Sequence, residues 1–132
     1  MPPLVYGLTF PVVADREVSA ELADLAAERA EWAVRHSWDF TNKAEARVVL
    51  AVARLRPGRL EEAERLGTKA LKAEELDQDD QAVALATVAM ARHARHLSGR
   101  RQLDQALRLD PDSAMVTEAA RFLAAQDTAG KA

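Results

Sequence analysis

The apolar positions of this chain recur every three or four residues over most of its length, which is the spacing of amphipathic helices. The clearest case is the stretch Ala44 to Asp77, where two such patterns are separated by Pro57-Gly58. Because that dipeptide ends a helix, the stretch predicts two helices joined by a tight turn. Gly67 stands inside the second helix at a cost of about 1 kcal/mol relative to alanine. Close approach of another helix would explain it.

The same periodicity predicts six helices. The first should begin at Asp15 or Ser19 and end between Ser37 and Phe40, and the second should run from Lys43 to about Arg56 after a cap at Thr41 or Asn42. The third should run from about Leu60 to Glu75, and the fourth from Asp79 or Asp80 to about Leu97. The fifth should run from Arg100 to Leu109, and the sixth from a cap at Asp112 or Ser113 to about Gln126. Because every connection is short, successive helices should be antiparallel neighbours.

Two of these helices carry patterns that predict how they are buried. In the first, an apolar-rich stripe at spacings of three and four predicts one buried face, made of Val18, Leu22, Leu25, Arg29, Trp32 and His36. In the second, apolar residues lie nearly all round the middle of the helix. That helix should therefore be sandwiched between neighbours.

The two ends of the chain differ from this helical middle. Residues 1–14 contain three prolines, Gly7 and several β-formers, so they predict an extended apolar arm that packs on its own domain or on another chain. Residues 15–126 predict a single helical domain, and residues 127–132 predict a frayed tail.

Composition narrows the class of protein. With 48% hydrophobic and 30% charged residues over 132 positions, the chain should fold around a core of its own. The absence of cysteine excludes disulfides and thiolate metal sites and suits a reducing compartment. The formal net charge of −3 gives no long-range attraction of the whole chain to nucleic acid or membrane. No apolar run approaches the roughly 18 residues of a membrane span, and the start lacks the features of a secretory signal. A cytoplasmic protein is expected.

One stretch resembles the tetratricopeptide (TPR) family. In Ala44 to Asp77, Leu50-Ala51 falls on the family's Leu-Gly pair, Gly58 on its turn, and Lys69-Ala70-Leu71 on its closing Lys-Ala-Leu. About one period later, Gln105-Ala106-Leu107 and Leu109-Asp110-Pro111 match the closing motif again. Arg47 and Arg54 replace family aromatics, and Glu75 replaces the proline. The resemblance implies a short right-handed TPR-like solenoid of about six antiparallel helices, and it is specific for architecture rather than function.

The resemblance also implies a binding surface. In the family, the first helix of each pair lines a concave groove, and here that groove would be apolar with arginines at its rim. The implied groove residues are Val48, Val52, Leu55, Arg56, Ala84, Val88, Ala91 and Arg92. Such a groove suits an apolar peptide or an amphipathic helix, unless helix packing buries its residues.

A basic patch offers a second candidate surface. Within ten residues the chain places Arg92, Arg95, His96, Arg100 and Arg101, a set that could grip phosphate or an acidic partner. The patch lacks interleaved aromatics and a groove-reading helix, which argues against nucleic acid as the partner. The alternative is a solvated face offset by nearby acidic residues, namely Asp79, Asp80 and the Glu61-Glu62-Glu64 run.

The residues do not predict an enzyme, a cofactor or a metal site. His93 and His96 have the spacing to share a metal, but no third ligand is near them in the sequence. The serines fit caps and turns, and there is no glycine-rich phosphate loop. Three hypotheses follow. The first is an adaptor or chaperone-like scaffold that binds a protein or peptide, and the second is a self-assembly module whose N-terminal arm fills the groove of a second copy. A basic-patch binder of nucleic acid or phosphate is the third.

Overall fold

The computed structural model describes residues 16–36, 40–74 and 76–131, with the side chains of 16–24, 40–42 and 126–131 left out. Within these ranges the chain is all-α and has no strand. The helices are α2 (Arg16–His36), α3 (Phe40–Ala53), α4 (Leu60–Ala70), α5 (Gln78–Ala94), α6 (Arg100–Leu109) and α7 (Ala114–Lys131). The expected arm over residues 1–14 lies outside the described residues.

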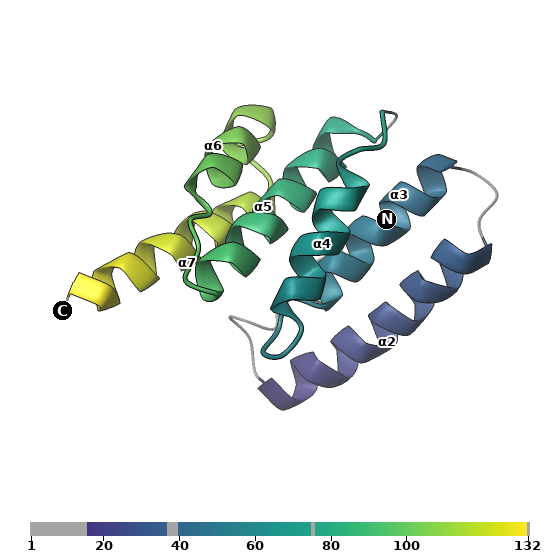
Figure 1. Cartoon of the computed structure of the whole chain (residues 1–132), viewed down its shortest axis with the longest axis horizontal. Helices are drawn as coiled ribbons and strands as arrows, with labels where there is room; N and C mark the ends of the chain where they lie inside the picture. Colours follow the sequence, from purple (N-terminus) through teal and green to yellow (C-terminus); the bar gives the residue numbers. More distant parts are fainter. Residues whose placement is uncertain (1–15, 37–39, 75, 132) are drawn as a thin grey trace.

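The helices stack in chain order as a short solenoid (Figure 1). Each helix from α2 to α5 packs extensively on the next one, whereas α7 packs more extensively on α5 than on α6. Additional packing joins α3 to α5, which places α5 in the middle of the stack. The helices α2 and α7 lie at opposite ends of the array.

The core has two parts, one on each side of α3 and α4. A smaller cluster joins α2 to α3 and α4, through Ala27, Ala30, Leu50, Ala51, Ala53 and Leu66. A larger cluster joins α3 and α4 to α5, α6 and α7. Because α3 contributes to both clusters, the prediction that this helix is sandwiched between neighbours is confirmed.

The central helix α5 is buried at ten successive positions, Ala82–Ala91. Thr87 among them satisfies its hydroxyl by donating to the Val83 carbonyl at 2.8 Å.

Close helix crossings depend on glycine at two positions. A Cβ on Gly67 would lie 2.8 Å from Val88 Cγ2 on α5, so the expected close approach of another helix is confirmed. A Cβ on Gly99 would lie 2.3 Å from the Ala89 carbonyl oxygen, so the start of α6 sits directly on the α5 backbone.

Several helix ends differ from the predicted ones. The helix α3 begins at Phe40, so Thr41 and Asn42 lie inside it instead of capping it. The helix α4 ends at Ala70 instead of Glu75, because tighter bonds from Lys72 and Ala73 to the carbonyls three residues earlier turn the chain. This turn buries Ala73 and Leu76.

At the C-terminal end, the helix α7 continues past the expected limit at Gln126. It reaches Lys131, and no proline or glycine interrupts the chain before Gly130. Ser113 caps this helix as predicted, with its Oγ accepting a bond from the Val116 N–H at 3.4 Å.

The helix α5 ends in a Schellman motif with an unusual residue at its left-handed position. The His96 N–H donates to the His93 carbonyl at 3.0 Å, and the Leu97 N–H donates to the Arg92 carbonyl at 2.8 Å. His96 has φ 64°, a backbone conformation that glycine adopts without the steric cost of a Cβ.

We therefore expect His96→Gly to stabilise the fold by about 0.5–1 kcal/mol. Glycine removes the steric cost of the left-handed backbone, and part of this gain is lost because glycine also gives the unfolded chain more conformational entropy. Urea unfolding followed by circular dichroism measures this change. His96→Ala is the control, because it removes the imidazole and keeps the Cβ. Equal effects of the two variants would locate the change in the ring and contradict the backbone explanation.

Candidate functional site

Six of the eight expected groove residues are core residues. The side chains of Val48, Val52, Leu55, Ala84, Val88 and Ala91 are 0–3% exposed. The expectation that they line an open surface is corrected. Ala84 and Val88 face Gly67 of α4 at the tight crossing, so they serve the contact between neighbouring helices. Val48, Val52 and Leu55 belong to the large core cluster that joins α3 and α4 to α5.

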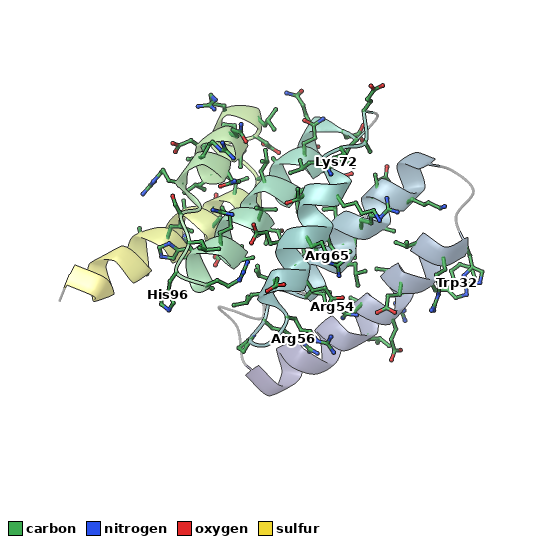
Figure 2. The ribbon with its side chains drawn as sticks, viewed as in Figure 1. Trp32, Arg54, Arg56, Arg65, Lys72 and His96 are labelled. Carbon is green, nitrogen blue, oxygen red and sulfur yellow. The ribbon has the colours of Figure 1, made fainter. Side chains whose placement is uncertain are left out.

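The two arginines of the expected groove remain half-buried at one edge of the stack. Arg56 follows the C-terminal end of α3, and Arg92 lies in the last turn of α5. Arg92 Nε donates to the Ser98 carbonyl at 2.6 Å, which fixes its guanidinium against the loop before α6. Figure 2 shows Arg56 and Lys72 at opposite edges of the stack, near opposite ends of the helices. The part of the predicted site that reaches the surface is therefore its arginine rim.

The basic patch is partly neutralised by carboxylates from α4. Glu64 accepts from Arg92 Nη1 at 2.9 Å and from Arg95 Nη1 at 2.6 Å, so one carboxylate bridges two arginines at the C-terminal end of α5. Arg95 Nη2 also lies 3.6 Å from Glu61 Oε2. Glu64 is 20% exposed and each arginine 30%, so these charge-assisted bonds are partly shielded from water.

Acidic residues thus offset part of the patch, as predicted for Glu61 and Glu64. Asp79 and Asp80 lie instead in the first turn of α5, at the far end of a 17-residue helix from Arg92 and Arg95. At 1.5 Å per residue that separation is about 20 Å, too far for a direct ion pair. His96, Arg100 and Arg101 are exposed, in the turn before α6 and in its first turn.

A buried arginine that sequence reasoning did not identify as a site joins three helices. Arg54, labelled in Figure 2, is 9% exposed at the end of α3, and its guanidinium bonds to Glu31 of α2. Its Nε lies 3.2 Å from Glu62 Oε1 of α4, a contact that lacks hydrogen-bond geometry. Glu62 also contacts Arg59 at 3.4 Å. The pairing with α2 and α4 explains how a cation is accommodated at this buried position.

The two histidines considered as metal ligands have different surroundings. The His93 ring packs edge-on against Phe122 of α7, with ring centroids 5.8 Å apart, whereas His96 is exposed in the turn. Among the described residues, three carboxylates do gather elsewhere: Glu45, Asp77 and Asp80 have oxygens within 4.8 Å of one another. The sequence did not reveal this cluster because Glu45 is on α3. Since acidic residues are favourable at the N-terminal end of α5, the helix dipole accounts for the two aspartates without a metal ion.

Comparison of the chain with protein-family models, with curated proteins and with solved structures finds no match. Among the described helices, none combines the length and the apolar character needed to cross a bilayer.

Proposed function

We propose that this chain is a protein-binding scaffold similar to TPR proteins, which binds a peptide or an amphipathic helix of another protein. The observation that carries the proposal is the layered packing of successive helix hairpins, with α5 held on several sides by its neighbours. Rigidly held helices present their surface side chains with little loss of conformational freedom on binding, which is what a recognition scaffold requires.

The proposed binding edge is where α3 and α5 end. Arg56 is half-buried there, Arg92 is already held by Glu64 and the Ser98 carbonyl, and Leu97, in the turn after α5, is 41% exposed. A partner that complements this edge carries a carboxylate that the positive charge of Arg56 attracts, next to an apolar residue that covers Leu97. The partner class proposed here is therefore an acidic peptide or an acidic amphipathic helix.

Selection of peptides from a displayed library against the immobilised full chain tests this function. Enriched peptides should share an acidic motif and bind the chain in solution, and Arg56→Glu should weaken their binding at least tenfold. Lys72→Glu is the matched control, because it makes the same change of charge at an exposed residue on the opposite edge of the stack. Failure to enrich any motif, or equal weakening by both variants, would contradict the proposed edge.

The nucleic-acid alternative gives a prediction of its own, because Glu64 and Glu61 pair with two of the arginines that would contact phosphate. We expect Glu61→Ala with Glu64→Ala to raise affinity for duplex DNA about tenfold at low salt, with a steeper salt dependence. Fluorescence anisotropy over a salt series measures this affinity. The control removes the same charge from exposed residues elsewhere, with Glu74→Ala and Asp112→Ala. Tight, salt-sensitive binding by the unmodified chain would contradict the neutralised patch.

A further inference from the structure

The outer face of α2 exposes two large apolar residues beside charged ones, although the sequence pattern predicted that this stripe would be buried. Trp32 is 60% exposed and Leu25 is 47% exposed, and Arg29 and His36 on the same stripe are exposed as well. The prediction is wrong at these positions because α2 packs on α3 through its opposite face, where Ala27 and Ala30 allow a close approach. Trp32 projects from the outer side of α2, away from the rest of the stack (Figure 2).

The exposed stripe has the spacing of a coiled-coil seam. Leu25, Arg29, Trp32 and His36 are separated by four, three and four residues, and in the sequence Val18 and Leu22 continue this alternation toward the start of the helix. Alternating steps of three and four place residues on one line along a helix, as at the a and d positions of a heptad. The stripe is therefore patterned to pack along another helix.

Part of this surface is already ordered. The rings of Trp32 and His36 stack with centroids 4.5 Å apart, and His36 Nδ1 lies 2.9 Å from the Trp32 carbonyl oxygen. A fixed aromatic side chain loses little conformational entropy when it is covered, so this end of the seam is suited to an interface.

The two ends of the stack differ in how they meet solvent. The described outer positions of α7 include Thr117 and Arg121, and Arg121 pairs with Glu118 at 3.3 Å. A terminal helix of a stacked array needs such a polar outer face to remain soluble alone. The outer face of α2 differs from that of α7, because it carries two large apolar residues, Leu25 and Trp32, beside the exposed charged residues Glu28, Arg29 and Arg35.

We propose that the outer face of α2 binds the same face of a second copy of this chain, with the two α2 helices antiparallel. The charges favour this orientation. A parallel pair in register would place Arg29 against Arg29 of the second copy. An antiparallel pair centred near Ala27 places Arg29 beside Leu25 of the second copy and within reach of its Glu28, which is also exposed. The face is thus complementary to itself under a twofold rotation.

The expected dimer is weak and reversible. The 21 residues of α2 span about 30 Å, and a single helix pair of that length buries less than the area of a standard interface. A dissociation constant on the order of 10 µM is therefore expected. The interface does not use the arginine edge proposed above for peptide binding, so either proposal can fail without the other.

Sedimentation velocity over a wide concentration series tests the dimer. Wild type should dimerise with concentration, and Trp32→Glu should weaken the dimer at least tenfold while leaving the helical circular dichroism spectrum and thermal melt unchanged. Leu107→Glu on α6 is the matched control, because Leu107 is another exposed apolar residue, and it should dimerise like wild type. A wild type that stays monomeric, or a dimer that Trp32→Glu leaves intact, would overturn the proposal.

Deletion of residues 1–14 tests whether the N-terminal segment, instead of a second α2, covers this face. If a monomeric chain dimerises only after the deletion, the chain's own N-terminal segment covers the face. If deletion abolishes a dimer that Trp32→Glu leaves intact, that segment makes the dimer instead. Either result would overturn the proposal.

Orientation is tested by cysteine pairing, since the chain has no cysteine of its own. A mixture of Leu25→Cys and Arg29→Cys chains should form the mixed disulfide in preference to either homodisulfide, whereas an Arg29→Cys homodisulfide as the main product would contradict the antiparallel arrangement.

Discussion

Replacing Val52 with aspartate is expected to unfold the chain. The Val52 side chain is fully buried in the large core cluster. An aspartate there would carry an unpaired carboxylate away from water, at a cost of several kcal/mol against a total stability of about 5–15 kcal/mol for a domain of this kind. We expect a loss of at least about 4 kcal/mol, measured by urea unfolding with circular dichroism, or no cooperative transition at all.

Two controls make this result specific to burial. Val52→Ala removes two methyl groups without adding charge and should cost about 1–2.5 kcal/mol. Lys69→Asp introduces a carboxylate at an exposed position of α4 and should change stability by less than about 1 kcal/mol. A Val52→Asp chain as stable as the Lys69→Asp chain would place Val52 on the surface, where the family resemblance had implied it.

Gly99→Ala is expected to cause the second largest loss of stability. The added Cβ would meet the Ala89 carbonyl oxygen at 2.3 Å and the Ala89 carbonyl carbon at 2.9 Å. These are backbone atoms inside α5, which is packed against its neighbours, so α6 must move as a whole to relieve the overlap. We expect a loss of about 3 kcal/mol or more, read from the midpoint of thermal or urea unfolding.

The other glycines provide an internal comparison. A Cβ on Gly67 meets mainly the end of the Val88 side chain, at 2.8 Å, and alanine gains about 1 kcal/mol of helix propensity there, so Gly67→Ala should cost clearly less than Gly99→Ala. Gly58 has open space around it but φ +84°, so its alanine variant should lose about 1 kcal/mol through backbone strain. A Gly99→Ala variant no less stable than the Gly58 variant would contradict the close contact between α6 and α5.

The sequence predicted the helices well because periodicity and helix-ending residues are local signals. The range of α6 was predicted to the residue, since Gly99 precedes it and Asp110-Pro111 follows it. The end of α4 was predicted five residues too late. Nothing in the local sequence breaks the helix at Ala70, and the turn there brings Ala73 and Leu76 into the core.

Which face of a helix is buried was harder to predict than where the helix lies. In α2 the larger apolar residues mark the exposed stripe, and the small residues Ala27 and Ala30 mark the buried one. A prediction based on the size of the apolar residues therefore identified the wrong buried face of α2, because close packing of two helices requires small side chains. The prediction of the groove residues was wrong for a related reason. Because α5 is buried on several sides, an apolar position near Val88 contacts a neighbouring helix instead of forming a surface.

Interactions between helices were partly predictable. The acidic run on α4 indicated which carboxylates could offset the basic patch, and Glu61 and Glu64 do so. The pairing of Arg54 with Glu31 was not predictable, because the two residues are 23 positions apart and belong to different helices. Long-range pairs of this kind depend on the stacking geometry, which no local pattern encodes.

The central claim is that the helices form an open stack with α2 and α7 at opposite ends. The most direct test is the distance between spin labels on cysteines introduced at Glu28 of α2 and Arg121 of α7, both exposed positions, in a chain that has no other cysteine. Labelled chains diluted with unlabelled chains report the distance within one copy. The stack predicts a single distance well beyond the roughly 10 Å that separates the axes of packed helices. A short distance, with α2 and α7 as packed neighbours in a closed bundle, would contradict it.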